Sequence, residues 1–128
     1  MNSPEMRMFK RVPFSSSEKI DAICKYKDGE NNAIRLHIAN ISEGGLGLMA
    51  KKNAIGPIQQ NDIILLDKVV GNQALDFMTD LELEVKWVLD SELMENLGFG
   101  CSFCNIPESS RDRIISFMNT MDLYKLQA

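Results

Sequence analysis

Residues 81–87 read Leu81-Glu82-Leu83-Glu84-Val85-Lys86-Trp87, and apolar and charged side chains alternate throughout this stretch. Side chains of a β-strand point alternately to its two faces, so this period predicts a strand with one buried face and one face in water. The pattern assigns Trp87 to the buried face. We therefore expect Trp87 to pack in the core and not to serve as a ligand platform.

Period-two patterning or a short apolar run marks five more strands, at residues 20–26, 34–38, 46–48, 63–66 and 99–103. Helical spacing of apolar side chains comes only after them and predicts one helix over about residues 107–124. About six short strands followed by one helix do not fit a parallel α/β sheet. We predict a mainly β fold, a six-stranded antiparallel β-barrel with a C-terminal α-helix, because barrel closure removes exposed strand edges.

The 128 residues, 45% of them hydrophobic and 25% charged, suit one globular domain. Residues 1–13 carry Pro4 and Pro13 and no periodic apolar pattern, so we expect a flexible N-terminal arm there and a single domain over residues 14–128. No apolar run approaches the ~20 residues of a membrane span. The N-terminal segment also lacks the apolar stretch of a signal peptide, so we expect a cytoplasmic protein.

Charge and the placement of the cysteines and the histidine argue against several classes of function. The formal net charge of −4 argues against nucleic-acid binding, which needs a broad positive surface. Cys101 and Cys104 form a lone C-x-x-C on a predicted strand, on opposite faces, and they lack the further ligands of a zinc site. His37 is the only histidine, on the polar side of its strand, and it has no visible catalytic partner. We therefore expect neither an enzyme nor a metal site.

Two short motifs remain. Arg7 and Arg11 form an R-x-x-x-R that encloses Lys10, and Asn40-Ile41-Ser42-Glu43-Gly44-Gly45 is an N-x-S-x-x-G. Alone, the first could be a solvated basic patch, and the second a tight turn whose Asn and Ser bond their own backbone. Together they favour an anionic, planar ligand that bears a purine, because guanidinium groups bind phosphates and the edge of guanine, and glycines allow close approach.

Strand parity supports an outward-facing site at the second motif. Ile34, Leu36 and Ile38 share one face of a strand, whereas Ile41 falls on the other. A bulge near residues 39–40 would return Ile41 to the core and turn Asn40 and Ser42 outward.

With these two motifs in this order, the sequence resembles the PilZ domain family, receptors for the bacterial second messenger cyclic di-GMP. Weaker signatures of the family follow each motif and recur along most of the chain. They are Arg11-Val12-Pro13, Gly45-Leu46, Val85-Lys86-Trp87 and Gly100-Cys101-Ser102-Phe103. Asn40 stands where the family more commonly has aspartate, and asparagine lies within its range.

The resemblance implies a PilZ-like barrel with cyclic di-GMP on its outer wall and no other cofactor. Arg7 and Arg11 would grip guanine and phosphate groups, with supporting charge from Lys10. Asn40 and Ser42 would contact a guanine, and Gly45 would keep the surface clear.

We therefore expect a stand-alone bacterial receptor that orders its N-terminal arm on binding and signals to a downstream protein effector. The alternative is a PilZ-fold module that binds only a protein, since fold does not fix function.

Overall fold

The computed structural model describes residues 11–26, 33–55, 57–90 and 92–127. These residues form seven strands, most of them in the segments with period-two patterning. The strands are β1 (Arg11–Pro13), β2 (Asp21–Tyr26), β3 (Ile34–Ser42), β4 (Gly45–Lys51), β5 (Ile63–Val70), β6 (Leu81–Leu89) and β7 (Asn96–Phe103). Short 3-10 helices η2 (Ser16–Glu18), η3 (Lys52–Ala54) and η4 (Gln73–Leu75) lie in the connections. The helix α1 (Glu108–Gln127) follows β7.

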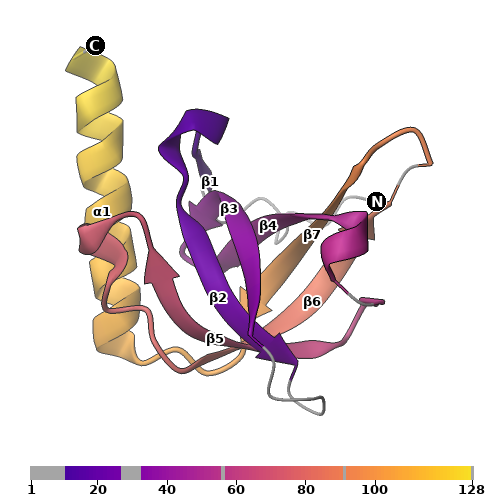
Figure 1. Cartoon of the computed structure of the whole chain (residues 1–128). Coiled ribbons are helices and arrows are strands. Elements are labelled where there is room, and N and C mark those ends of the chain that lie inside the picture. The colour runs from indigo at the N-terminus through magenta and orange to yellow at the C-terminus, as the bar shows by residue number, and fades with distance from the viewer. Residues whose placement is uncertain (1–10, 27–32, 56, 91, 128) are drawn as a thin grey trace, which may run out of the picture.

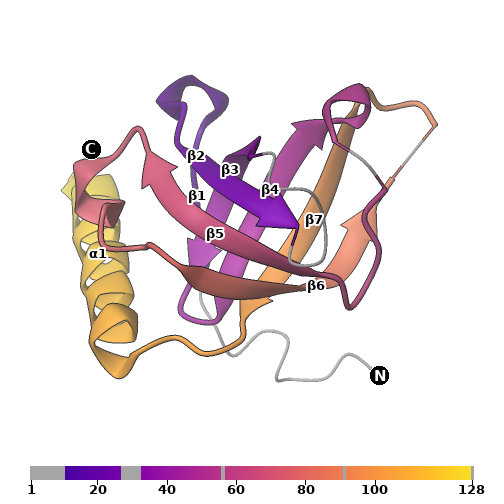
Figure 2. The same ribbon diagram turned by 60° about the horizontal axis from the view of Figure 1, so that its bottom comes forward.

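Six of these strands close into an antiparallel barrel, which confirms the predicted fold (Figure 1). Around the barrel the order is β2-β3-β4-β7-β6-β5, and β5 pairs again with β2. Figure 2 shows the barrel from a second direction, with α1 alongside it. Closure leaves these strands without free edges, which is the physical reason that so many short strands form one stable sheet.

β1 is the additional strand, and it pairs with β3 beyond the point where β2 leaves it. β2 pairs with β3 up to His37, whereas β1 pairs with residues 40–42. Three residues of the expected N-terminal arm therefore belong to the sheet. Residues 1–10, which include Arg7 and Lys10, lie outside the described residues.

The core is formed by the inward faces of the strands and by one face of α1. Ile114, Phe117 and Met118 of α1 are buried, and the ring of Phe117 lies 6.1 Å from that of Phe14. Burial of each large apolar side chain contributes about 1.5–3 kcal/mol. In the described ranges, no helix combines the length and the apolar character needed to cross a bilayer.

β3 contains the bulge that strand parity predicted. Its register against β4 shifts between Ile38 and Asn40, so that Ile38 pairs with Leu48 and Asn40 with Gly47. Ile38 and Ile41 are both fully buried as a result. The extra residue allows one strand to bury apolar side chains at both even and odd positions.

A second bulge makes the prediction for Trp87 wrong. The register between β6 and β7 shifts between Val85 and Trp87, which leaves Lys86 as the extra residue. Val85 is fully buried, but Trp87 has 38% of its surface exposed on the outer wall. Unbroken alternation of apolar and charged side chains cannot reveal a shift that the partner strand imposes.

The three cysteines are free thiols. Burial raises the pKa of Cys24 to about 12, with a smaller contribution from the charge of Asp67. Burial likewise raises the pKa of Cys101 to about 12. Cys104 lies just past the end of β7 and is half-buried.

These pKa values predict selective thiol chemistry. Because the thiolate is the reactive form, an aromatic disulfide reagent at mildly alkaline pH should modify Cys104 promptly in the folded protein and leave Cys24 and Cys101 intact. Absorbance of the released thiol should show all three reacting in urea. The Cys104→Ser variant should lose the fast phase, and a fast phase that persists in this variant would contradict the assignment.

Gly45 of β4 lies against the backbone of β7. A β carbon there would overlap the backbone carbonyl oxygen of Cys101. We expect Gly45→Ala to lower the free energy of unfolding by about 1–3 kcal/mol, the usual cost of overpacking, in urea denaturation. Gly98→Ala is the matched control, because its β carbon would meet nothing nearer than the Leu89 side chain at 4.0 Å. Equal stability of the two variants would contradict this reading.

Candidate functional site

One row of residues crosses the outer wall of the barrel through five neighbouring strands. It runs from β1 through β3, β4 and β7 to β6, and its members are Pro13, Asn40, Gly47, Gly100 and Trp87. The centre of the row consists of two glycines that face each other. The wall therefore carries no side chain at the centre of the row, between the polar Asn40 and the aromatic Trp87.

Planar groups cover both glycines. A β carbon on Gly47 would lie 2.5 Å from the Asn40 side-chain nitrogen, and one on Gly100 would overlap the indole of Trp87. The amide and the indole can lie this close to the sheet only because glycine occupies both positions. The result is a wall bordered by an amide on β3 and by an aromatic ring on β6.

Arg11 connects the two sequence motifs. It stands opposite Ser42 in the pairing of β1 with β3, and its Nη1 donates a hydrogen bond to Oδ1 of Asn40 over 3.2 Å. The structure thus brings together residues that are 29 positions apart in the chain. The bond is exposed to solvent, so it contributes little to folding and leaves the guanidinium accessible.

Ser42 has a different environment from the outward-facing one that we expected. The residue is 5% exposed, and its Oγ accepts hydrogen bonds from the backbone N–H groups of Gly44 and Gly45, at 3.2 and 3.1 Å. The same hydroxyl donates to the Gly45 carbonyl oxygen over 3.3 Å. Its observed contacts hold the turn between β3 and β4.

Gly45 begins β4 directly after this turn and pairs with Ser102 of β7. The family resemblance implied that this glycine keeps the ligand surface clear, and the structure adds a second requirement. Contact with the backbone of β7 leaves no room for a side chain.

A groove of about 420 Å³ opens over this part of the wall. Arg11, Ser42 and Gly45 line it together with two residues that the motifs did not include, Lys86 and Trp87. Asn40 adjoins the groove through its hydrogen bond to Arg11. Arg7 and Lys10 lie outside the described residues, so their placement relative to the groove stays a prediction.

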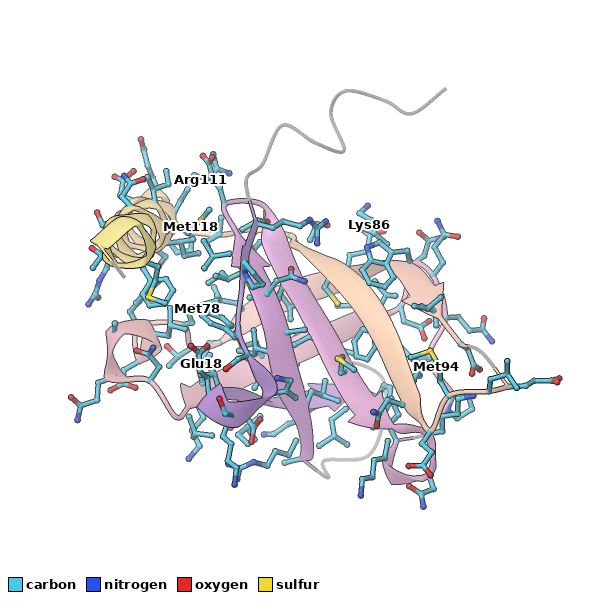
Figure 3. All side chains as sticks on the ribbon, turned by 90° about the horizontal axis from the view of Figure 1, so that it is seen from above. Glu18, Met78, Lys86, Met94, Arg111 and Met118 are labelled. Carbon is cyan, nitrogen blue, oxygen red and sulfur yellow. The ribbon has the colours of Figure 1, made fainter. Side chains whose placement is uncertain are left out.

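Lys86 and Trp87 reach the groove through the bulge in β6. Figure 3 shows Lys86 on the same wall as β7, and its Nζ lies 3.3 Å from Oε1 of Glu84. Two sequence signals could have pointed to this side of the site. Gly98 and Gly100 leave alternate positions of one strand without side chains, and Gly45 and Gly47 do the same on its neighbour.

The chemistry of the groove suits binding. Arg11 and Lys86 supply cations, and Trp87 offers an aromatic surface. A histidine that could act as a base is missing from the described lining. Among the described residues, no three histidine, cysteine, aspartate or glutamate side chains gather to hold a metal ion.

Comparison with solved structures shows a shared fold. MrkH from K. pneumonia, solved as a complex with c-di-GMP, is 20% identical with a TM-score of 0.68, over 94% of this chain and 54% of that one. The PilZ domain of YcgR from Escherichia coli with c-di-GMP is 15% identical with a TM-score of 0.67, over 94% and 97%. MotI/DgrA, the Bacillus subtilis inhibitor of motility, is 15% identical with a TM-score of 0.68, over 93% and 52%.

This chain spans about half the length of MrkH and of MotI/DgrA. A comparison with curated proteins found no match. The model of the PilZ domain matches residues 5–120, which is most of the sequence. The chain therefore belongs to the PilZ domain family.

Proposed function

We propose that this protein is a bacterial receptor for cyclic di-GMP, which binds in the groove between Arg11 and Trp87. The observation that carries the proposal is the convergence of the Arg11–Asn40 pair and the Trp87 ring on a wall of glycines. The PilZ domain is a binding domain and not a known class of enzyme. The complexes of MrkH and of the YcgR PilZ domain with c-di-GMP support the same ligand class.

Each part of the ligand has a counterpart in the groove. The guanidinium of Arg11 offers paired donors to a phosphate or to the O6 and N7 edge of guanine. Asn40 is held beside it by the hydrogen bond to Oδ1 and can contact a base edge at close range. Trp87 presents a face on which a purine can stack, and Lys86 adds a second positive charge.

Ser42 and Gly45 contribute in a different way from Asn40. Because the Ser42 hydroxyl bonds the backbone of Gly44 and Gly45, we infer that it shapes the turn beside the ligand. Gly45 permits the close approach of β4 to β7 on which the glycine wall depends.

Signalling follows from the position of the first motif. Arg7 lies four residues before β1, so its binding to the ligand would draw the N-terminal arm over the barrel. Charge-assisted hydrogen bonds contribute about 1.5–3 kcal/mol each, and ordering a segment costs about 2–5 kcal/mol. The net binding free energy that remains suits reversible sensing. A downstream protein would then recognise the ordered arm.

Substitution of the two arginines tests the site directly. We expect Arg7→Ala and Arg11→Ala each to weaken cyclic di-GMP binding at least about tenfold, the effect of losing one charge-assisted contact. Calorimetric titration measures the affinity. The melting temperature without ligand should stay nearly constant, because the Arg11 bond is exposed.

Arg111→Ala is the control, since this arginine is exposed on α1 and lies outside the groove. Equal affinity of wild type and both arm variants would refute the receptor model. The alternative, a PilZ-fold module that binds only a protein, would then be the better account of the function.

Trp87 provides a second, independent test because it is the only tryptophan in the chain. Stacking of a base should change its fluorescence in proportion to binding. Trp87→Ala should weaken affinity about tenfold or more, given that aromatic stacking contributes about 1–3 kcal/mol per base, while Trp87→Phe should retain most of it. Binding seen by calorimetry with no change in the emission would place the ligand elsewhere.

A further inference from the structure

A second groove, of about 600 Å³, lies on the outer face of β2, β3 and β4. Its floor is apolar and includes Ala39, Met49 and Ala50. Three cations, Lys19, Arg35 and Lys51, stand around it. The groove thus combines an apolar centre with a basic rim, which the nucleotide-binding motifs do not explain.

The single carboxylate of the groove lining is already neutralised. Nε of Arg35 donates to Oδ2 of Asp21 over 2.7 Å, and Nδ1 of His37 lies 3.5 Å from Oδ1. Lys19 and Lys51 make no ion pair with any other described residue. Positive charge is therefore in excess here, although the whole chain has a net charge of −4.

Lys19 occupies a backbone conformation that glycine would adopt more easily. Its φ of 36° and ψ of 49° are left-handed, and its carbonyl packs so closely on Gly71 that a β carbon on Gly71 would overlap it. A side chain at such a position carries a conformational cost. The lysine at this position lines the groove.

We propose that this groove docks an acidic segment of a partner protein through at least one apolar side chain. Carboxylates of such a segment would complement the unpaired lysines, and its apolar side chain would cover the exposed floor. A nucleic acid would suit the cations but not the floor. Of the two rings in the described lining, that of Phe14 is 7% exposed and offers no face for stacking, and the imidazole of His37 has its Nδ1 3.5 Å from Oδ1 of Asp21.

The position of the groove connects it with the candidate nucleotide site. The backbone N–H of Phe14 donates to the Ala39 carbonyl over 2.9 Å, directly before Asn40 in β3, and Arg11 lies at the other end of β1. Figure 3 looks onto this wall, with Lys86 on one side and Glu18, the neighbour of Lys19, on the other. The inference rests on the proposed function in taking the partner to be the receptor's effector.

The test uses the full chain and a short dye-labelled peptide in which glutamate and leucine alternate. Fluorescence polarisation should show binding about tenfold tighter than that of a lysine–leucine peptide or a glutamate–serine peptide, because both charge and apolar contact contribute. Lys19→Gly and Lys51→Ala should each weaken binding about fivefold, a loss typical of one charged contact. Lys68→Ala, which changes an exposed lysine of β5 that does not line the groove, should leave the affinity unchanged.

Three results would overturn the proposal. They are equal binding of the glutamate–leucine and glutamate–serine peptides, unchanged affinity in both groove variants, or tighter binding of a single-stranded oligonucleotide than of the peptide. Lys19→Gly should keep or raise the melting temperature, so loss of binding cannot be attributed to unfolding. Titration of the same variants with cyclic di-GMP, followed through Trp87 fluorescence, reports on the nucleotide site separately. Absence of cyclic di-GMP binding while peptide binding is intact would refute the receptor model and leave the docking groove standing.

Discussion

Close approach of β4 to β7 is the constraint on which the rest of the molecule depends. A β carbon at Gly45 would overlap the backbone of β7, so the two strands pack here without a side chain, and Gly47 and Gly100 face each other further along the wall. With no β carbons beneath them, the Asn40 amide and the Trp87 indole lie against the sheet. Missing side chains therefore let the strands pack closely and also let an amide and an aromatic ring lie flat against the sheet.

Two bulges decide which side chains border that surface. The bulge in β3 lets Ile38 and Ile41 both reach the core and leaves Asn40 on the outer wall. The bulge in β6 removes Trp87 from the core and places it across from Asn40. Each bulge exchanges regular pairing for a change in the direction of one side chain, a common device beside binding sites.

Patterning in the sequence was sufficient to predict the barrel, the C-terminal helix and the bulge in β3, because each follows from local periodicity and its interruption at Ile41. The bulge in β6 was not predictable in this way, since Leu81 to Trp87 alternate without a break and the shift arises from pairing with β7. Strand parity wrongly turned Ser42 outward, whereas its hydroxyl bonds the backbone of a turn, as the alternative interpretation of the motif suggested. Sequence also gave no sign that Lys19, Arg35 and Lys51, from three separate segments, share one groove.

The shortness of β1 has a thermodynamic consequence. Its three residues begin with Arg11, which lines one groove, and end directly before Phe14, which lines the other, so both grooves adjoin the same small strand. Any coupling that β1 carries must be reciprocal, with each occupant changing the affinity for the other by the same factor. Under the proposed function, two occupants that strengthen each other's binding would make an abundant effector lower the messenger concentration at which the receptor responds.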